Sequence, residues 1–189
     1  MKYRIPRGFR NASPVVRVIA PCGTLLGHEE RIASGLVDLE RAGFEVRFDH
    51  TLLKRQSRGY LAGSDQVRAD EFMAAVREPD VDLVWCARGG SGAARLLEKL
   101  RTQLHSIEPR WIVGFSDCTS IINTLSIEYH WTCIHGPTIS LIGGRPNHID
   151  NLTNLINQLS SRLKNEDDAE VPVYGGNLTV LGACMGDLD

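Results

Sequence analysis

What the sequence lacks excludes three classes of protein. No segment approaches the roughly 20 consecutive apolar residues that span a bilayer, and the apolar run Val15–Ala20 is too short for the core of a signal peptide. The formal net charge is −2, so no basic excess is available to bind a nucleic-acid backbone. We therefore expect a cytoplasmic protein with neither a membrane nor a nucleic acid among its partners.

Cysteine is scarce, and its spacing is irregular. The five cysteines are Cys22, Cys86, Cys118, Cys133 and Cys184, and no two stand in C-x-x-C spacing. The odd number and the spacing predict neither a disulfide framework nor a zinc site, and a reducing compartment fits better. Free cysteine is more often a small buried apolar residue than a nucleophile, and we interpret Cys22 and Cys118 in this way.

Strand-like and helix-like segments alternate along the chain. Hydrophobic residues make up 42% and charged residues 23%, the mix of an ordinary globular domain. The predicted strands are Val15–Ala20, Phe44–Phe48, Asp82–Ala87, Trp111–Gly114 and Thr132–Ile134; the predicted helices are Glu29–Ala42, one capped by Ser64 or Asp65, Ala93–Leu100, Thr119–Tyr129 and Ile149–Leu163. This order predicts an α/β fold, a mainly parallel sheet flanked by helices on both faces.

Three of the predicted strands end in loops with unusual residues. The loops are Ala20–Gly23 (APCG), Cys86–Gly92 (CARGGSG) and Gly114–Asp117 (GFSD). In a parallel sheet the carboxyl ends of the strands meet at one edge, where sites gather. We therefore expect the three loops to lie together.

Ser116 stands between a predicted strand and a predicted helix. A sharp strand-to-helix turn exposes a hydroxyl at the sheet edge and aims the first helical N–H groups at the group under attack, as in a nucleophile elbow. The segment departs from G-x-S-x-G, because Cys118 stands where the second glycine would be. The motif alone also fits a serine that caps the helix, so both interpretations stay open.

The glycine-rich segment Gly89–Gly92 also has two functional interpretations. Glycines allow close approach of a backbone, and their N–H groups can form an anion-binding nest. This suits an oxyanion hole or a nucleotide phosphate, although the Lys-Ser/Thr ending of a P-loop and the G-x-G-x-x-G pattern are absent. A tight turn into a helix is the structural alternative. Arg88 suits a carboxylate clamp or a surface ion pair.

A serine nucleophile needs a base, which in many hydrolases is a histidine. Of the six histidines, only His135 ends a predicted strand and so falls near the expected site. It is a candidate for an internal base, or a structural histidine that shapes the turn before Pro137. Sequence alone favours the structural role.

These motifs together resemble the LD-carboxypeptidases, serine peptidase family S66, which includes the muramoyltetrapeptide carboxypeptidases and the microcin C self-immunity proteins. The resemblance follows the family's order and approximate spacing over nearly the whole chain. It rests on Ala20–Gly23, Tyr60–Asp65 with Arg68–Ala69, Ala87–Gly92, Gly114–Asp117, His135–Pro137 and Gly175–Leu178.

The resemblance implies a Rossmann- or flavodoxin-like domain that carries the nucleophile of a serine carboxypeptidase. The family uses a Ser-His-Glu triad with no cofactor or metal, and removes the terminal D-alanine from muropeptide tetrapeptides in peptidoglycan recycling. A peptide substrate and a homodimer of the full-length protein follow from it. The alternatives are a microcin-type amide hydrolase, a non-catalytic fragment and, from the fold alone, a nucleotide- or phosphate-binding protein.

Carried over to this sequence, the resemblance makes Ser116 the nucleophile. The backbone N–H groups of Asp117 and of Gly89 or Gly90 would form the oxyanion hole. Donors of this kind each contribute roughly 3–4 kcal/mol of transition-state stabilisation.

The resemblance also implies which residues meet the substrate. Arg88 would help build the wall of the site. Ser91 stands in place of the family's usual tyrosine, and Cys22 stands where a serine is common. We expect all three to contribute to substrate binding, and Ser91 to alter the pocket.

The resemblance further implies two domains. The nucleophile-bearing domain would cover residues 1–163, an acid-rich linker residues 164–174, and the start of a second, truncated domain residues 175–189. In the family the second domain carries the Glu and the His of the triad. By resemblance, neither is expected within this chain.

Overall fold

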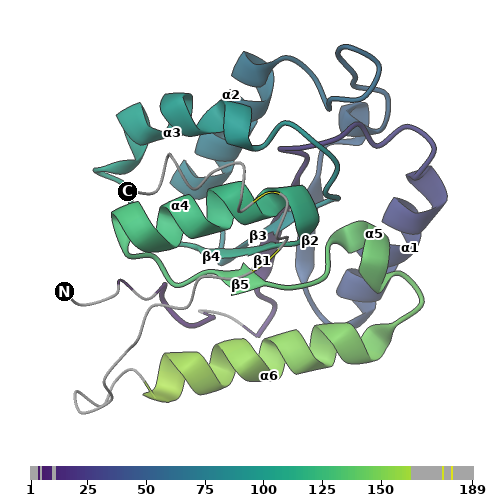
Figure 1. The fold of residues 1–189 in the computed structure, drawn as a ribbon. Helices are drawn as coiled ribbons and strands as arrows, with labels where there is room; N and C mark the ends of the chain where they lie inside the picture. The colour runs from purple at the N-terminus through teal and green to yellow at the C-terminus, as the bar shows by residue number, and fades with distance from the viewer. Residues whose placement is uncertain (1–3, 5, 10–11, 163–175, 177–179, 181–189) are drawn as a thin grey trace.

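The computed structural model describes residues 4, 6–9, 12–162, 176 and 180, and its strands and helices alternate along the chain (Figure 1). The strands are β1 Val15–Ile19, β2 Glu45–Phe48, β3 Leu83–Cys86, β4 Trp111–Gly114 and β5 Ile134–His135. The α-helices are α1 Glu29–Arg41, α2 Asp65–Arg77, α3 Leu97–Leu104, α4 Thr119–Tyr129, α5 Ile139–Ile142 and α6 Pro146–Arg162. Short 3₁₀ helices are η1 His50–Leu53, η2 Ala94–Leu96 and η3 Ser116–Cys118.

The strands form one parallel sheet in the order β2-β1-β3-β4-β5. The predicted α/β fold is therefore confirmed. After β1 the chain first adds β2 on one side and then β3 on the other, so the direction of winding reverses between β1 and β3. In open α/β sheets the crevice for ligands opens at such a switch point, beyond the carboxyl ends of the strands.

Each face of the sheet packs against its own set of helices (Figure 1). Residues of α2, α3 and α4 cover one face, which includes Val84 of β3. Residues of α1, α5 and α6 cover the other face, which includes Trp85 of β3 and Trp111 of β4. Neighbouring strand residues point to opposite faces, and both faces are covered. This explains why β3 and β4 are apolar and buried along their whole length.

Two helix ends carry residues that suit their position, and the first, Ser64, is one of the two predicted caps. Ser64 is the N-cap of α2, and its hydroxyl accepts a hydrogen bond from the backbone N–H of Val67 at 3.3 Å. Gly43 follows the C-cap of α1 with φ at +91°, a conformation that glycine adopts without strain.

The boundaries of several elements differ from the prediction; α6, predicted from Ile149, begins at Pro146. The helix predicted from Ala93 begins as η2 and continues as α3 to Leu104. The fifth strand lies at Ile134–His135, beyond most of the predicted segment Thr132–Ile134. Sequence analysis does not predict η1 or α5, because four residues make little more than one turn and leave no periodic signal.

The predicted linker, residues 164–174, lies outside the described residues. Of the predicted start of a second domain, only Gly176 and Val180 are described. Within the described part of the chain, no helix has the length and apolar character needed to cross a membrane.

Candidate active site

The three loops with unusual residues lie together at the carboxyl edge of the sheet. They follow β1, β3 and β4, which are adjacent strands. The backbone N–H of Gly23 donates to the carbonyl of Gly89 at 3.1 Å, and Nη1 of Arg88 donates to the carbonyl of Thr24 at 2.7 Å. These bonds tie the β1 loop to the β3 loop at the switch point of the sheet.

Ser116 occupies a sharp turn between β4 and α4. Its φ is +60°, in the left-handed region, whereas Phe115 before it is extended with φ at −142°. No side chain caps the start of η3 or of α4, so the turn does not have the geometry of a capping serine. A left-handed non-glycine residue costs about 1–3 kcal/mol, and such residues concentrate at functional sites.

A close contact beneath Ser116 makes this turn possible. A Cβ atom at Gly114 would lie 2.7 Å from the Cβ of Cys118 and 3.2 Å from the Sγ atoms of Cys118 and Cys86. Only glycine at position 114 leaves room for the cysteine two residues after Ser116. The departure from G-x-S-x-G at Cys118 is therefore accommodated by the glycine on the other side of the turn.

The glycine-rich loop packs directly against Ser116. A Cβ atom at Gly89 would lie 2.9 Å from the Cβ and 3.2 Å from the Oγ of Ser116. Gly90 has φ at +121°, and a Cβ there would lie 2.9 Å from the Cα of Gly23. The backbone at Gly89 thus lies next to the Ser116 hydroxyl, where N–H groups are useful for an oxyanion hole, and Gly90 follows it against the β1 loop. Packing within the protein accounts for both glycines without a bound phosphate.

Asp117 connects the β4 loop to the glycine-rich loop through its side chain. The carboxylate is buried, and its Oδ2 accepts a hydrogen bond from the backbone N–H of Ala93 at 2.9 Å. Burial raises the pKa of Asp117 above its ordinary value, and the bond from Ala93 and the charge of Arg68 oppose this rise. Sequence analysis considers only the backbone of Asp117 and gives its side chain no role.

His135 lies beside the Ser116 turn. It pairs with Gly114 across β4 and β5, and its ring centroid lies 5.1 Å from that of Phe115. Its Nε2 lies 3.4 Å from Oγ1 of Thr119. Among the described residues, no hydrogen bond joins a histidine to Ser116.

Cys22 is placed differently from the substrate-binding role predicted for it. Its side chain has no exposed surface, and its Sγ lies 3.3 Å from the Sγ of Cys118. Burial raises the pKa of the Cys22 thiol, and hydrogen bonds with Cys22 and Cys86 lower the pKa of Cys118. The thiol of Cys22 therefore points into the core under the site, which agrees with its interpretation as a small buried residue and leaves no surface for a substrate.

Arg88 and Ser91 lie at the rim of the site, where Arg88 is half-buried and Ser91 is exposed. The pKa of nearby His28 is lowered, first by partial burial and then by the positive charges of Arg88 and Arg31. The side chain of Phe115 is 44% exposed at the same edge. The rim thus offers a cationic group and an exposed aromatic ring.

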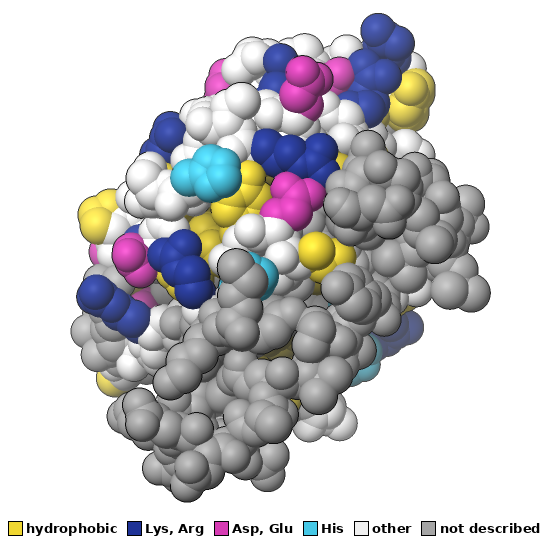
Figure 2. Space-filling view, turned by 60° about the vertical axis from the view of Figure 1, so that its left-hand side comes forward, with side chains coloured by type: hydrophobic (Ala, Val, Ile, Leu, Met, Phe, Trp, Pro, Cys, Tyr) yellow, Lys and Arg dark blue, Asp and Glu magenta, His cyan; other side chains and the backbone are white. Residues whose placement is uncertain are grey.

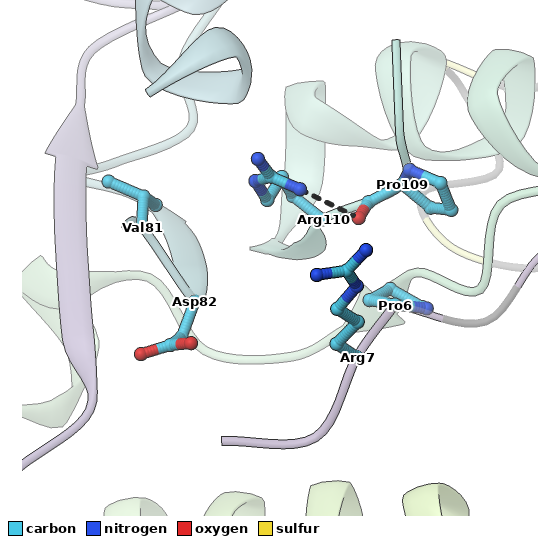
Figure 3. A pocket seen from close by; sticks show the side chains of 6 residues that line it. All are labelled: Pro6, Arg7, Val81, Asp82, Pro109 and Arg110. Atoms are coloured by element: carbon cyan, nitrogen blue, oxygen red, sulfur yellow. Dashed lines mark hydrogen bonds between the residues drawn. The ribbon is translucent and has the colours of Figure 1, made fainter. Parts of the chain in front are cut away.

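A second hollow lies at the opposite, amino edge of the sheet (Figure 3). It is lined by Pro6, Arg7, Val81, Asp82, Pro109 and Arg110. Its volume is about 10 Å³, which is room for about one water molecule. It is too small for an organic substrate.

Charges are mixed on the molecular face drawn in Figure 2. Over its described residues, basic and acidic side chains are interspersed, and neither sign forms a continuous block. The described part of the chain also contains no group of three or more His, Cys, Asp or Glu residues placed to hold a metal ion.

Sequence analysis assigns no role to Arg68, which lies in α2 directly under the candidate site. The structure buries its side chain completely. The available signal is a charged residue beside Ala69 and Phe72, which belong to the stripe of apolar residues that marks the buried face of this helix.

Comparison with known families identifies one match. Residues 16–136, more than half of the chain, match the model of the LD-carboxypeptidase N-terminal domain. The murein tetrapeptide carboxypeptidase of Pseudomonas aeruginosa is 32% identical over 92% of this chain and 61% of its own length. The microcin C7 self-immunity protein MccF of Escherichia coli is 27% identical over 65% of this chain and 35% of its own length. The chain thus spans less than two thirds of the length of these relatives.

Solved structures show the same fold. The crystal structure of an MccF-like protein from Bacillus anthracis superposes with a TM-score of 0.70 at 22% sequence identity, and covers 80% of this chain and 46% of that protein. At this identity the likeness concerns the fold, and it agrees with the parallel sheet and its helical layers.

Proposed function

The chain belongs to the LD-carboxypeptidase family, and on that premise we propose that it carries the nucleophile, Ser116, of a serine carboxypeptidase. The observation that supports this most is the left-handed turn at Ser116, which holds a serine between β4 and α4 at the switch-point edge of the sheet. Strand-to-helix turns of this kind hold a nucleophilic hydroxyl clear of the sheet and next to helical N–H groups.

The proposed oxyanion hole is made of backbone N–H groups. One comes from Asp117, which follows Ser116 and begins the helical region, where N–H groups have no partner within the helix. The second comes from Gly89, which packs against Ser116, or from Gly90, the next residue of the loop. Donors placed beforehand stabilise the developing oxyanion without reorganisation, which is their main contribution to the rate.

The proposed substrate is a peptide that ends in a free carboxylate, and more narrowly a muropeptide tetrapeptide that loses its terminal D-alanine. Arg88 supplies a positive charge at the rim, and Ser91 and Phe115 supply neighbouring exposed surface. A guanidinium matches the geometry of a carboxylate. The name of the Pseudomonas relative supports this class of substrate.

The base that activates Ser116 is proposed to come from outside the described residues or from another chain. By family resemblance, the Glu and the His of the triad belong to a second domain. His135 is the local alternative, but its ring contacts Phe115 and Thr119. A serine without its base and orienting carboxylate loses several orders of magnitude in rate.

A second candidate function is hydrolysis of a microcin-type amide. The likeness to MccF and MccF-like proteins favours it. The chemistry at Ser116 would be the same, because both reactions pass through a tetrahedral oxyanion. The two functions differ only in the group that the rim accepts.

The test is labelling of Ser116 by a fluorophosphonate probe, together with assays of D-alanine release from a muropeptide tetrapeptide and of hydrolysis of an aminoacyl-sulfamoyl nucleoside. We expect a protein with the complete triad to label, and Ser116→Ala to lower turnover by at least about 10⁴-fold. Ser106→Ala is the matched control, since it removes an exposed hydroxyl between α3 and β4, away from the elbow and the rim.

The outcomes separate the alternatives. If this chain is labelled by itself and the labelling is lost in His135→Ala, His135 is the base. Labelling only in a protein extended through a second domain would place the base there. Equal labelling of wild type and Ser116→Ala would refute the proposed nucleophile.

A further inference from the structure

A fully buried arginine lies beneath the glycine-rich loop. Arg68 belongs to α2, and its side chain is 0% exposed. An arginine remains charged in a protein, and a buried charge is tolerated only where hydrogen bonds and an opposite charge satisfy it. The partners of Arg68 therefore determine which parts of the fold depend on it.

Those partners come from three different loops. Nε of Arg68 donates to the carbonyl of Gly63 at 3.2 Å, in the loop before α2. Nη1 donates to the carbonyl of Pro21, after β1, and to that of Gly92, after β3, at 2.9 Å. Nη2 donates to Oδ1 of Asp65 at 2.6 Å. One guanidinium thus joins the two loops on either side of the switch point.

The contact with Gly92 leaves no room for a side chain. Gly92 has φ at +101°, and a Cβ atom there would lie 2.5 Å from Cδ2 of Leu61 and 3.1 Å from Nη2 of Arg68. The last glycine of the loop is therefore required by its left-handed backbone and by its contact with Leu61, and it brings the backbone close to Arg68.

The peptide group between Gly92 and Ala93 is held at both of its polar atoms. Its carbonyl oxygen accepts from Arg68, and its N–H donates to Asp117. A peptide group is planar, so two such bonds on opposite sides define its orientation. Because Gly89 and Gly90 lie only a few residues before it, this anchor limits where their N–H groups can point.

We propose that Arg68 is a positioning residue. Together with the Asp117 carboxylate it orients the Gly92–Ala93 peptide, and so holds the backbone of Gly89 beside Ser116 and that of Gly90 beside Gly23. The catalytic value of that arrangement rests on the proposed function, whereas the positioning itself does not. A guanidinium is suited to this role because its planar fork presents donors in several directions at once.

Arg95 provides a matched control. It binds the same carboxylate, with Nε and Nη2 at 2.9 Å and 2.6 Å from Oδ2 of Asp65, but its side chain is exposed at the surface. Arg95→Lys weakens the ion pair at Asp65. Arg68→Lys weakens that ion pair and also the bonds to the three loops, because a lysine lacks the fork.

The experiment is site-resolved amide hydrogen exchange on this chain. The reporters are the amides of Gly23 and Ala93, which donate to Gly89 and to Asp117. In Arg68→Lys we expect both to exchange at least about tenfold faster, because charge-assisted bonds that hold the loop are lost. The amides of β3 and β4 should change much less, and Arg95→Lys should match wild type.

Unchanged exchange rates at Gly23 and Ala93 in Arg68→Lys would overturn the proposal. An equal increase in the exchange rates of the loop, β3 and β4 would also overturn it, because it indicates a general loss of stability. If Arg68→Lys fails to fold, exchange in the wild-type protein still tests the proposal. Gly23 and Ala93 amides that exchange as fast as the amide of exposed Gly59 would show that Arg68 does not hold the loop in place.

Labelling of Ser116, measured in parallel, separates this proposal from the proposed function. Exchange needs no reaction at Ser116, so slow reporters together with a serine that stays unreactive even in a protein with the complete triad refute only the proposed function. A reactive serine with freely exchanging reporters refutes only the role of Arg68. If the proposed function and the role of Arg68 are both correct, Arg68→Lys should slow the labelling of Ser116 at saturating probe. The concentration of probe that gives half-saturation should stay unchanged.

Discussion

At the carboxyl edge of the sheet, the loops after β1, β3 and β4 carry glycines where any side chain would collide with a neighbour, and their charged partner, Arg68, is buried. Toward the amino edge, charges are paired at the surface instead. Arg47 binds Glu78 at 2.5 Å and Asp80 at 2.6 Å, and these side chains are partly exposed. The pKa of Arg47 is raised, first by its hydrogen bond with Asp80.

The difference shows what each edge requires. A site that holds backbone N–H groups in place needs loops in close contact, and a buried cation can bind several carbonyl oxygens at once. At the amino edge no backbone groups have to be held in place for a site, so ion pairs that are screened by solvent are sufficient there. The small cavity there agrees with this, since it has room for only about one water molecule (Figure 3).

The largest effect should come from filling the space beside Ser116. Gly89→Ala places a Cβ 2.9 Å from that of Ser116. We expect it to lower the rate of Ser116 labelling at least about 100-fold, as removal of an oxyanion donor does. Gly8→Ala, whose Cβ would meet Ser160 at an ordinary 3.4 Å, is the control and should label normally. Normal labelling of Gly89→Ala would show that the loop tolerates displacement.

Next in size is the loss of the two arginines. Arg68→Met should lower the free energy of unfolding by about 3 kcal/mol, because carbonyl oxygens and Asp65 lose a buried partner. Arg47→Met should cost less than about 1 kcal/mol, as expected for screened surface pairs. Denaturant unfolding measures both values. Similar costs would remove the distinction between the edges.

Two buried carboxylates, one at each edge, allow a comparison between replacements that should destabilise the fold by similar amounts. Asp117 accepts from the N–H of Ala93, and Asp82 at the amino edge accepts from the N–H of Val15 at 3.0 Å. We expect Asp117→Asn and Asp82→Asn each to cost about 1–2 kcal/mol of folding free energy. Only Asp117→Asn should also slow the labelling of Ser116. If both variants label alike, the Asp117 side chain does not support the site.

The smallest effect is on the pH dependence of stability. Burial raises the pKa of Asp117 above its ordinary value of 3.8, so the stability it provides is present below pH 3.8 and is lost as the pH rises through the folded pKa. The pKa of Asp65 is lowered, mainly by the hydrogen bond from Arg95, so its contribution is present above pH 3.8 and is lost as the pH falls.

Each aspartate can be replaced to check this. As the pH rises above 3.8, the free energy of unfolding of wild type should fall relative to Asp117→Asn. As the pH falls below 3.8, that of wild type should fall relative to Asp65→Asn. Denaturant unfolding over a pH series measures both slopes. Slopes of the same sign in the two comparisons would contradict the assigned environments.

Much of the fold and the outline of the site follow from the sequence. The apolar runs bounded by glycine and proline mark four of the strands to within a residue or two, and parallel order then places the three loops at one edge. The turn at Ser116 is suggested by a small residue, an aromatic residue and a serine between strand and helix. The sequence leaves open whether that serine caps the helix, because the choice depends on φ at one residue.

Sequence by itself thus determined the alternation of elements, the parallel sheet and the loop that bears Ser116, because these depend on local periodicity and on glycine and proline nearby. Tertiary structure alone decided that Cys22 packs on Cys118 and that Arg68 joins the loops of Pro21 and Gly92. These contacts link residues 96, 47 and 24 positions apart, and nothing local encodes them. A side chain's role in such a site is set by where the folded chain brings its partners.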